Sequence, residues 1–195
     1  GSQSWSKISA GGSHTAAIRS DGLLFTWGGN SNGQLGIGNT FDIYSPVQIG
    51  TSSWTSVAAG GSHAAAIRTD GALFTWGLNS NGQLGDGTAT SKSSPVQIGT
   101  SSWSSVSAGQ NHTAAIRTDN GLFTWGLNSS GQLGDGTTVV KSSPVQIGTS
   151  SWSSVSAGSS HTAAIRTDNG LFTWGLGTSG QLGDGTIVNK SSPVQ

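Results

Sequence analysis

Apolar positions in this chain fall into short runs, each closed by glycine, serine or an Asp-Gly pair. One stretch shows four such runs, at 56–59, 63–68, 73–76 and 95–98. Runs of this length suit β-strands and are too short for stable helices, even where alanine is abundant. Pro95 opens the last run, where a strand need not donate a hydrogen bond to its neighbour. The pattern therefore predicts four short strands, the last of them ending at Gly99.

The whole pattern occurs four times with an uninterrupted period of 49 residues, in units 1–49, 50–98, 99–147 and 148–195. Two residue types mark the period most clearly: His14, His63, His112 and His161, and Trp27, Trp76, Trp125 and Trp174. We interpret both sets as structural residues of the repeat. The chain is therefore predicted to be a single domain, residues 1–195, made of four copies of one supersecondary unit.

Four strands in about 40–50 residues is the size of one blade of a β-propeller. A single blade leaves both of its sheet faces uncovered, so its neighbours must cover them. We predict an all-β fold, a β-propeller of four-stranded antiparallel blades with four blades per chain. A linear solenoid of stacked four-stranded units is the main alternative.

The order of motifs within each unit resembles a known family. One copy reads Ala108-Gly109, then His112-Thr113, then Phe123-Thr124-Trp125-Gly126, then Gly131-Gln132-Leu133-Gly134. This order resembles the regulator of chromosome condensation repeat, and the resemblance covers the chain four times. Kelch repeats have a similar length, but their order of Gly-Gly, Tyr and Trp is not followed. The resemblance implies a β-propeller, typically with seven blades in this family.

The number of blades leads to a prediction about assembly. Four blades closing alone fill about 90° each, whereas seven fill about 51° and eight about 45°. Two copies of this chain match the family's geometry best, so we predict a homodimer that closes an eight-bladed ring. An open half-ring would expose apolar sheet faces. A lone four-bladed ring and a fragment of a longer array are the alternatives.

Charge is sparse, with eight Lys and Arg residues against eight Asp and no Glu. So few cations form no basic patch, and no apolar run reaches the ~20 residues of a membrane span. We therefore expect no nucleic-acid partner and no membrane partner. Cysteine is absent, which removes thiolate ligands and nucleophiles. Near-identical units offer the same few groups repeatedly, so we predict no catalysis, no cofactor and no metal.

Several repeated groups suggest chemistry at first sight. The four histidines could bind a metal if they converged, but we expect each imidazole to hydrogen-bond loop backbone. Arg68 and Asp70 are interpreted as a strand end and an Asx turn. Asp86 lies in Gly-Asp-Gly, where one carboxylate is far short of the oxygens that calcium takes, so a turn is predicted. The stretch 82–85 is glycine-rich but has no lysine for a phosphate site.

The units differ mainly in predicted loops. Positions before the repeated histidine vary, at Ser13, Ser62, Gln110, Asn111, Ser159 and Ser160. The first unit is the outlier, because four apolar or aromatic residues replace polar ones there: Ile37, Phe41, Ile43 and Tyr44. We treat these four as a candidate partner-contact loop. The alternatives are that the loop packs on its own blade or serves the junction between two chains.

Known roles of the resembled family narrow the function. Nucleotide exchange on a small GTPase uses a wedge insertion, for which the uninterrupted period leaves no room. Chromatin docking uses a basic tail, which this sequence does not show. Ultraviolet sensing clusters Trp and Arg where this chain has Gly61-Ser62. We predict a non-enzymatic scaffold that binds protein through its loop face. The alternative is a multivalent glycan-binding propeller. High self-similarity and the Gly1-Ser2 start also fit an engineered or recently amplified array without a selected ligand.

Overall fold

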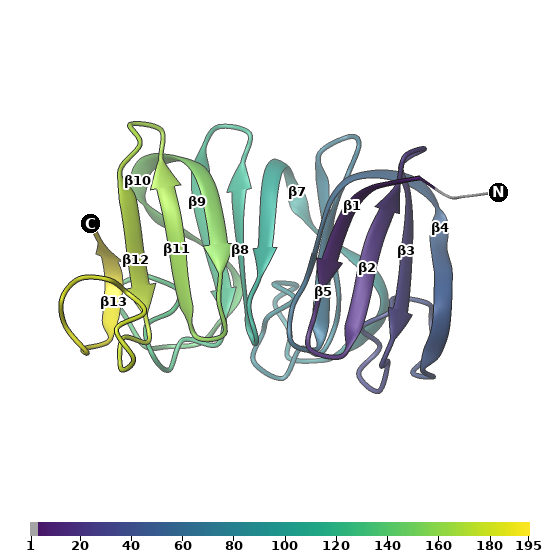
Figure 1. The fold of residues 1–195 in the computed structure, drawn as a ribbon, viewed down its shortest axis with the longest axis horizontal. Coiled ribbons are helices and arrows are strands. Elements are labelled where there is room, and N and C mark those ends of the chain that lie inside the picture. Colours follow the sequence, from purple (N-terminus) through teal and green to yellow (C-terminus); the bar gives the residue numbers. More distant parts are fainter. Residues whose placement is uncertain (1–3) are drawn as a thin grey trace.

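The computed structural model describes residues 4–195, which form thirteen β-strands and no helix (Figure 1). Residues 1–3, including the Gly1-Ser2 start, lie outside the described part. Each strand pairs antiparallel with its neighbours in sequence order. The all-β prediction is confirmed. The strands are β1 (Trp5–Ala10), β2 (His14–Arg19), β3 (Leu23–Gly28), β4 (Ile43–Ala59), β5 (His63–Arg68), β6 (Ala72–Gly77), β7 (Lys92–Ala108), β8 (His112–Arg117), β9 (Gly121–Gly126), β10 (Lys141–Ala157), β11 (His161–Arg166), β12 (Leu171–Gly175) and β13 (Lys190–Val194).

Three strands are long because each serves two neighbouring groups of strands. The first part of β4 pairs with β3, as in Gly28 opposite Ile43, and its last part pairs with β5. The predicted strand end at Gly99 is wrong, because β7 runs through this glycine to Ala108. Gly99 has a φ of 60°, a conformation that glycine adopts without steric cost. The glycine therefore lets the strand twist from one group into the next.

The pairing divides the chain into four consecutive four-stranded groups, here called units 1 to 4. Unit 1 contains β1, β2, β3 and the first part of β4, and unit 4 contains the last part of β10 with β11, β12 and β13. Units 2 and 3 are built in the same way between them. Figure 1 shows the units side by side, with the two chain ends at opposite ends of the molecule.

The apolar core lies between successive units rather than within one. Ile18 and Leu24 of unit 1 belong to the same buried cluster as Trp54 and Trp76 of unit 2. Two equivalent clusters join unit 2 to unit 3 and unit 3 to unit 4. Small alanines such as Ala64 in these clusters let the sheets approach closely. No helix in residues 4–195 is long and apolar enough to cross a membrane.

Candidate functional site

A four-residue hydrogen-bond system connects unit 2 to unit 3. Thr113 donates its hydroxyl proton to the main-chain oxygen of Gln83 at 2.8 Å, and its Oγ1 lies 2.9 Å from Nε2 of His63. A threonine hydroxyl has one proton, so His63 must be the donor, with its own proton on Nε2. Trp125 donates its indole N–H to the same Gln83 oxygen at 3.0 Å. We call this set the junction relay.

The junction relay is repeated between units 3 and 4. His112 lies 2.9 Å from Thr162, and both Thr162 and Trp174 donate to the Gln132 oxygen. All of these groups are buried. A buried polar group without a partner costs about 1–3 kcal/mol, so the relay fixes how two units dock. It explains why Trp and His recur at a fixed spacing.

The first junction lacks one member of the relay. Ala64 replaces the threonine, and neither ring nitrogen of the buried His14 has a hydrogen-bond partner among residues 4–195. Trp76 still donates to the Gln34 oxygen at 2.9 Å. Burial lowers the pKa of His14 to about 4. The junction between units 1 and 2 therefore keeps its tryptophan contact and loses its histidine contact.

The expectation that each imidazole binds loop backbone is wrong for His63 and His112, whose rings contact the threonine of the next unit instead. Each ring also lies close to the glycine of the Gly-x-x-His motif, with Cε1 and Nδ1 nearest to where a Cβ would stand. A Cβ on Gly109 would lie 2.4 Å from Cε1 of His112 and 2.4 Å from the Gly158 oxygen. The motif is thus a packing requirement. Among residues 4–195, no three His or Asp residues come together as metal ligands.

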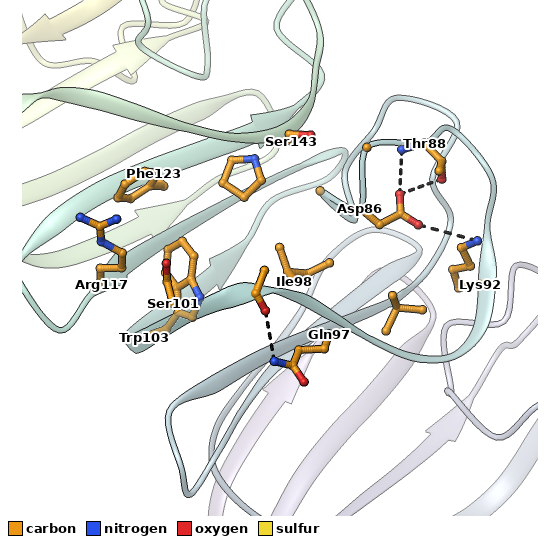
Figure 2. Close-up of a pocket in the computed structure, with 15 residues that line it drawn as sticks. Asp86, Thr88, Lys92, Gln97, Ile98, Ser101, Trp103, Arg117, Phe123 and Ser143 are labelled. Carbon is orange, nitrogen blue, oxygen red and sulfur yellow. Dashed lines mark hydrogen bonds and ion pairs between the residues drawn. The ribbon is translucent and has the colours of Figure 1, made fainter.

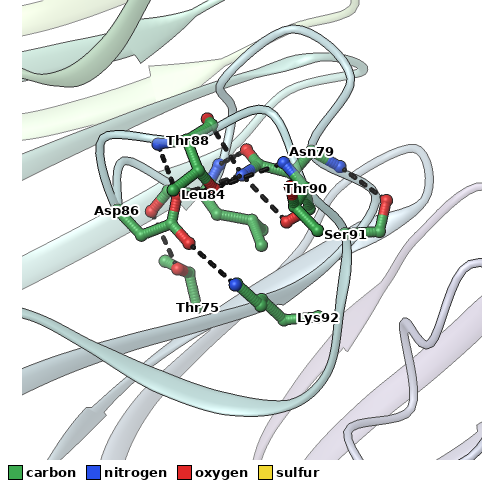
Figure 3. Close-up of polar contacts among 8 residues, drawn as sticks. All are labelled: Thr75, Asn79, Leu84, Asp86, Thr88, Thr90, Ser91 and Lys92. Atoms are coloured by element: carbon green, nitrogen blue, oxygen red, sulfur yellow. Dashed lines mark hydrogen bonds and ion pairs between the residues drawn. The ribbon is translucent and has the colours of Figure 1, made fainter.

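The charged residues make local contacts that hold turns. Asp86 accepts hydrogen bonds from the amide and hydroxyl of Thr88 and from Asn79, and it lies 3.7 Å from Nζ of Lys92 (Figure 3). Burial tends to raise the pKa of Asp86, but these hydrogen bonds bring it below its usual value. Arg68 pairs with Asp70 of its own unit and stacks on Phe74. Both predicted turns are present, and neither group forms a ligand cage.

Two equivalent grooves open at the outer side of the later junctions. One, of about 680 Å³, runs from Asp86 and Lys92 past Ile98 to Trp103 and Arg117 (Figure 2). The other, of about 660 Å³, has the same lining one unit further on. The indole N–H groups of Trp103 and Trp152, one in each groove, are buried without a protein partner. The same N–H of Trp54 is buried without a partner too, so the accessible polar groups of the grooves are those of the Asp–Lys pairs and the arginines.

The candidate partner-contact loop is divided in the structure. Ile37 packs against the core cluster of units 1 and 2, and Ile43 begins β4, opposite Gly28. Phe41 and Tyr44 are exposed, Tyr44 with 93% of its surface accessible. Part of this stretch therefore packs on the molecule and part faces outward.

The variable positions before each histidine also separate into two kinds. Gln110 and Ser159 line a shallow hollow of about 340 Å³ together with repeated glycines. The main-chain oxygens at the other positions accept hydrogen bonds from the residues after β3, β6, β9 and β12. These oxygens belong to Ser13, Ser62, Asn111 and Ser160. Main-chain oxygens are available in any residue, which explains why the side chain there is free to vary.

Both end units expose residues that are buried at the internal junctions. Trp5 of unit 1 is 40% exposed, whereas Trp54, Trp103 and Trp152 are 3–6% exposed. Leu171 of unit 4 is 57% exposed, whereas its counterparts Leu24, Leu73 and Leu122 are fully buried. Ile8 and Ile165 are exposed at the same two ends. Unit 1 therefore exposes the face that a preceding unit would cover. Unit 4 exposes the face that a following unit would cover.

Known proteins match the chain at several levels. A family model described as RCC1-like domain matches residues 1–195. The Ultraviolet-B receptor UVR8 of Arabidopsis thaliana is 54% identical over 44 residues, which are 23% of this chain and 10% of that protein. The X-linked retinitis pigmentosa GTPase regulator of Homo sapiens is 44% identical over 43 residues, 22% of this chain and 4% of that protein.

Solved structures match over the full length. Human WBSCR16 superimposes with a TM-score of 0.89 and 25% identity, over 97% of this chain and 52% of that one. Yeast RCC1 (Prp20), solved bound to Kap60, superimposes with a TM-score of 0.87 and 22% identity, over 100% of this chain and 49% of that one. This chain therefore spans about half the length of these structures. The predicted family resemblance and the RCC1-type propeller fold are confirmed.

Proposed function

This chain belongs to the RCC1-like domain family, and we propose that it is a protein-binding propeller scaffold whose ring is closed by two copies. In this proposal each of units 1 to 4 is one blade, and the homodimer has eight blades. Residues 1–195 form a single domain with blade boundaries close to the sequence repeats 1–49, 50–98, 99–147 and 148–195.

The observation that carries the ring is the complementarity of the two end faces. Inside the chain, Ile18 and Leu24 belong to the buried cluster that contains Trp54 of the following unit. Ile165 and Leu171 are the same positions in unit 4, and they lie exposed. Trp5 is the position of Trp54 in unit 1, and it is exposed as well. Unit 1 of a second copy can therefore cover unit 4 of the first, as each internal unit covers the one before it. Burial of apolar surface stabilises such a contact by about 25 cal/mol per Å².

The extent of the structural match supports the same arrangement. Four units cover about half of the RCC1-type chains they superimpose on, and a second half completes a ring. Head-to-tail contacts between identical copies form a closed ring when the rotation closes and a filament when it does not. Each chain of the proposed ring uses both of its ends, so no sheet face stays open.

The mass in solution tests the ring. Sedimentation equilibrium of the intact chain is expected to give twice 19.6 kDa. Leu171→Lys places a charge in the closing face and is expected to give single chains. Val139→Lys is the matched control, because Val139 is also exposed but belongs to a loop of unit 3. A wild-type mass of one chain, or open-ended polymers, would contradict the homodimer.

We propose the loop face as the protein-binding surface of the ring. Phe41, in the loop before β4, and Tyr44, at the start of β4, are exposed aromatic residues that the other three units lack at these positions. Aromatic residues are enriched at binding hot spots. Solved relatives bind proteins, since Prp20 has been solved with Kap60 and described as binding Gsp1p and histones. Those partners are the relative's own. We infer no catalytic role, because the repeated groups serve turns and junctions.

A selection from a displayed peptide library tests protein binding. We expect peptides whose binding to the ring is lost when Phe41 and Tyr44 are replaced by Thr and Ser, the residues of unit 2 at these positions. The variant should keep the dimer's mass, which separates loss of the surface from loss of the ring. No enrichment would favour an engineered or recently amplified array without a selected ligand.

The two equivalent grooves favour a second candidate, multivalent glycan binding. Each groove has a tryptophan in its lining, and each lies between an Asp–Lys pair and an arginine. Weak identical sites gain strength when several bind one glycan chain. Titration of a glycan array that shows saturable binding, lost in Trp103→Phe, would support this function. If no glycan on the array binds, this function is contradicted and the protein-binding scaffold is the remaining proposal.

A further inference from the structure

The junction relay is present in two separated halves at the two ends of the chain. Unit 4 holds the histidine and the acceptor carbonyl, at His161 and Gln181, and unit 1 holds the threonine and the tryptophan, at Thr15 and Trp27. All four residues are partly exposed. Their counterparts in the complete relays are buried: His63, His112, Gln83, Gln132, Thr113, Thr162, Trp125 and Trp174.

We propose that these two halves combine across the closing junctions of the two-chain ring, an inference that rests on the proposed homodimer. His161 of one copy donates from Nε2 to the Thr15 hydroxyl of the other. Thr15 donates its proton to the main-chain oxygen of Gln181, and Trp27 donates its indole N–H to the same oxygen. Each ring contains two such closing junctions.

The chemistry of the two halves is complementary. At the junction of units 3 and 4, the Gln132 oxygen accepts from both Thr162 and Trp174, which uses the two lone pairs of a carbonyl. Gln181 occupies the place of Gln132 in unit 4, and its oxygen is free to accept the same two donors. Thr15 accepts one hydrogen bond and donates another, as Thr113 does between His63 and Gln83. Every group of the closing relay except Nδ1 then has a partner.

The relay also gives the contact a direction. Apolar burial between Trp5 and Leu171 has no preferred orientation by itself. The donors at Trp27 and Thr15 find their acceptor carbonyl only on unit 4, so two unit 1 faces brought together would bury these donors unpaired. A donor that is buried without an acceptor destabilises the contact that buries it. The relay therefore selects head-to-tail closure over contacts between like ends.

The position of the missing threonine is consistent with this role. Ala64 removes the histidine contact at the first internal junction, where β4 runs continuously from unit 1 into unit 2. The covalent chain keeps those two units together without it. At the ends, where the chain supplies no such connection, Thr15 and His161 are both retained. Thr113 and Thr162 are present at the two internal junctions that β7 and β10 bridge, so the covalent connection makes the threonine dispensable at the first junction without excluding it elsewhere.

Matched substitutions at closing and internal junctions test the closing relay. Thr15→Ala is expected to raise the dissociation constant of the dimer about 30-fold, because about 1 kcal/mol is lost at each of two junctions. Trp27→Phe is expected to act in the same direction. The controls, Thr113→Ala and Trp125→Phe, change internal junctions and should lower stability while leaving the dissociation constant unchanged. Sedimentation equilibrium, or exchange between labelled copies, gives the constants.

A double-mutant cycle identifies the contact itself. His161→Phe and Thr15→Ala should each weaken the dimer, and the double variant should be little weaker than either, because both remove one shared hydrogen bond. Thr15→Ala gives unit 1 the alanine that unit 2 already has, so the variant is expected to fold. If the wild type is a dimer and neither Thr15→Ala nor Trp27→Phe changes its dissociation constant, the relay is overturned and the ring is not. A monomeric wild type overturns the ring.

Discussion

Asp86 and Lys92 face each other 3.7 Å apart and connect the loop of unit 2 to the start of β7. Units 3 and 4 repeat the ion pair at the same positions, with 3.4 Å and 3.2 Å between the charged atoms. In unit 1 both partners are replaced together, by Ile37 and Ile43. Ile37 packs against the cluster around Trp76. Each unit therefore has either both charges or neither.

Exchange of this pair in unit 1 gives the first prediction. Ile37→Asp alone places a carboxylate in a half-buried site without its cation, and we expect a loss of about 2–4 kcal/mol in the free energy of unfolding. Adding Ile43→Lys supplies the cation and is expected to recover most of that loss. Urea unfolding of the two single variants and the double variant gives the coupling free energy. A double variant no more stable than Ile37→Asp would contradict the pairing.

The first junction offers a stabilising substitution. Ala64→Thr places a hydroxyl where Thr113 and Thr162 have theirs, between His14 and the Gln34 oxygen. We expect the free energy of unfolding to rise by about 1 kcal/mol, because an unpartnered buried imidazole gains a hydrogen bond. Ala64→Val has the same shape without the hydroxyl and is the matched control. If valine stabilises as much as threonine, packing rather than the hydrogen bond is responsible.

The repeat made the strands and the family predictable from sequence. Residues 63–68 are predicted as a strand and found as β5, because Gly61 and Asp70 bound a run with one clear period. The continuation of β7 through Gly99 was missed, because glycine ends many strands and only its backbone conformation distinguishes a twist from an end. The repeat alone does not predict the ion pair between Lys92 and Asp86 either. The joint replacement of both residues in unit 1 does indicate that the two positions are in contact.

The junction relay was beyond sequence reasoning for a different reason. His63 and Thr113 are 50 positions apart and meet only because one sheet packs on the next. The sequence shows that both residues recur, but the same recurrence is expected for a histidine that binds its own loop. At the first junction His14 is kept although Ala64 replaces the threonine, so the variation between the units does not reveal the pairing either. Recognising the pairing requires knowing which faces touch.

Acid is expected to destabilise the folded chain through its buried histidines. Burial lowers the pKa of His63 to about 3 and of His112 to about 4, below the ordinary value of 6.5. The unfolded state therefore binds more protons below pH 6.5, and stability falls as pH decreases from about 6.5 towards 4. Each histidine contributes up to about 1.4 kcal/mol per pH unit. Urea unfolding at several pH values above 5, where aspartates stay ionised, measures the slope.

A histidine variant tests whether the buried histidines cause this pH dependence of stability. His112→Gln removes one titrating group and should reduce the pH dependence by about one proton, whatever its effect on absolute stability. Replacing the exposed Lys7 with Gln should leave the dependence unchanged over the same range. A slope that stays the same in His112→Gln would mean that other groups take up the protons.

The glycine of the Gly-x-x-His motif gives the last prediction, because two glycines separate packing from backbone effects. Gly109→Ala places a Cβ 2.4 Å from both the His112 ring and the Gly158 oxygen. One neighbour is backbone of the next unit and cannot move away, so we expect a loss of about 3 kcal/mol or more. Gly99→Ala meets no atom within 4 Å and has only a positive φ to oppose it, at a cost of about 1–2 kcal/mol. Thermal and urea unfolding of both variants compare the costs. A loss in Gly109→Ala no greater than in Gly99→Ala would contradict the packing requirement, because Gly109 has no positive φ that a Cβ would strain.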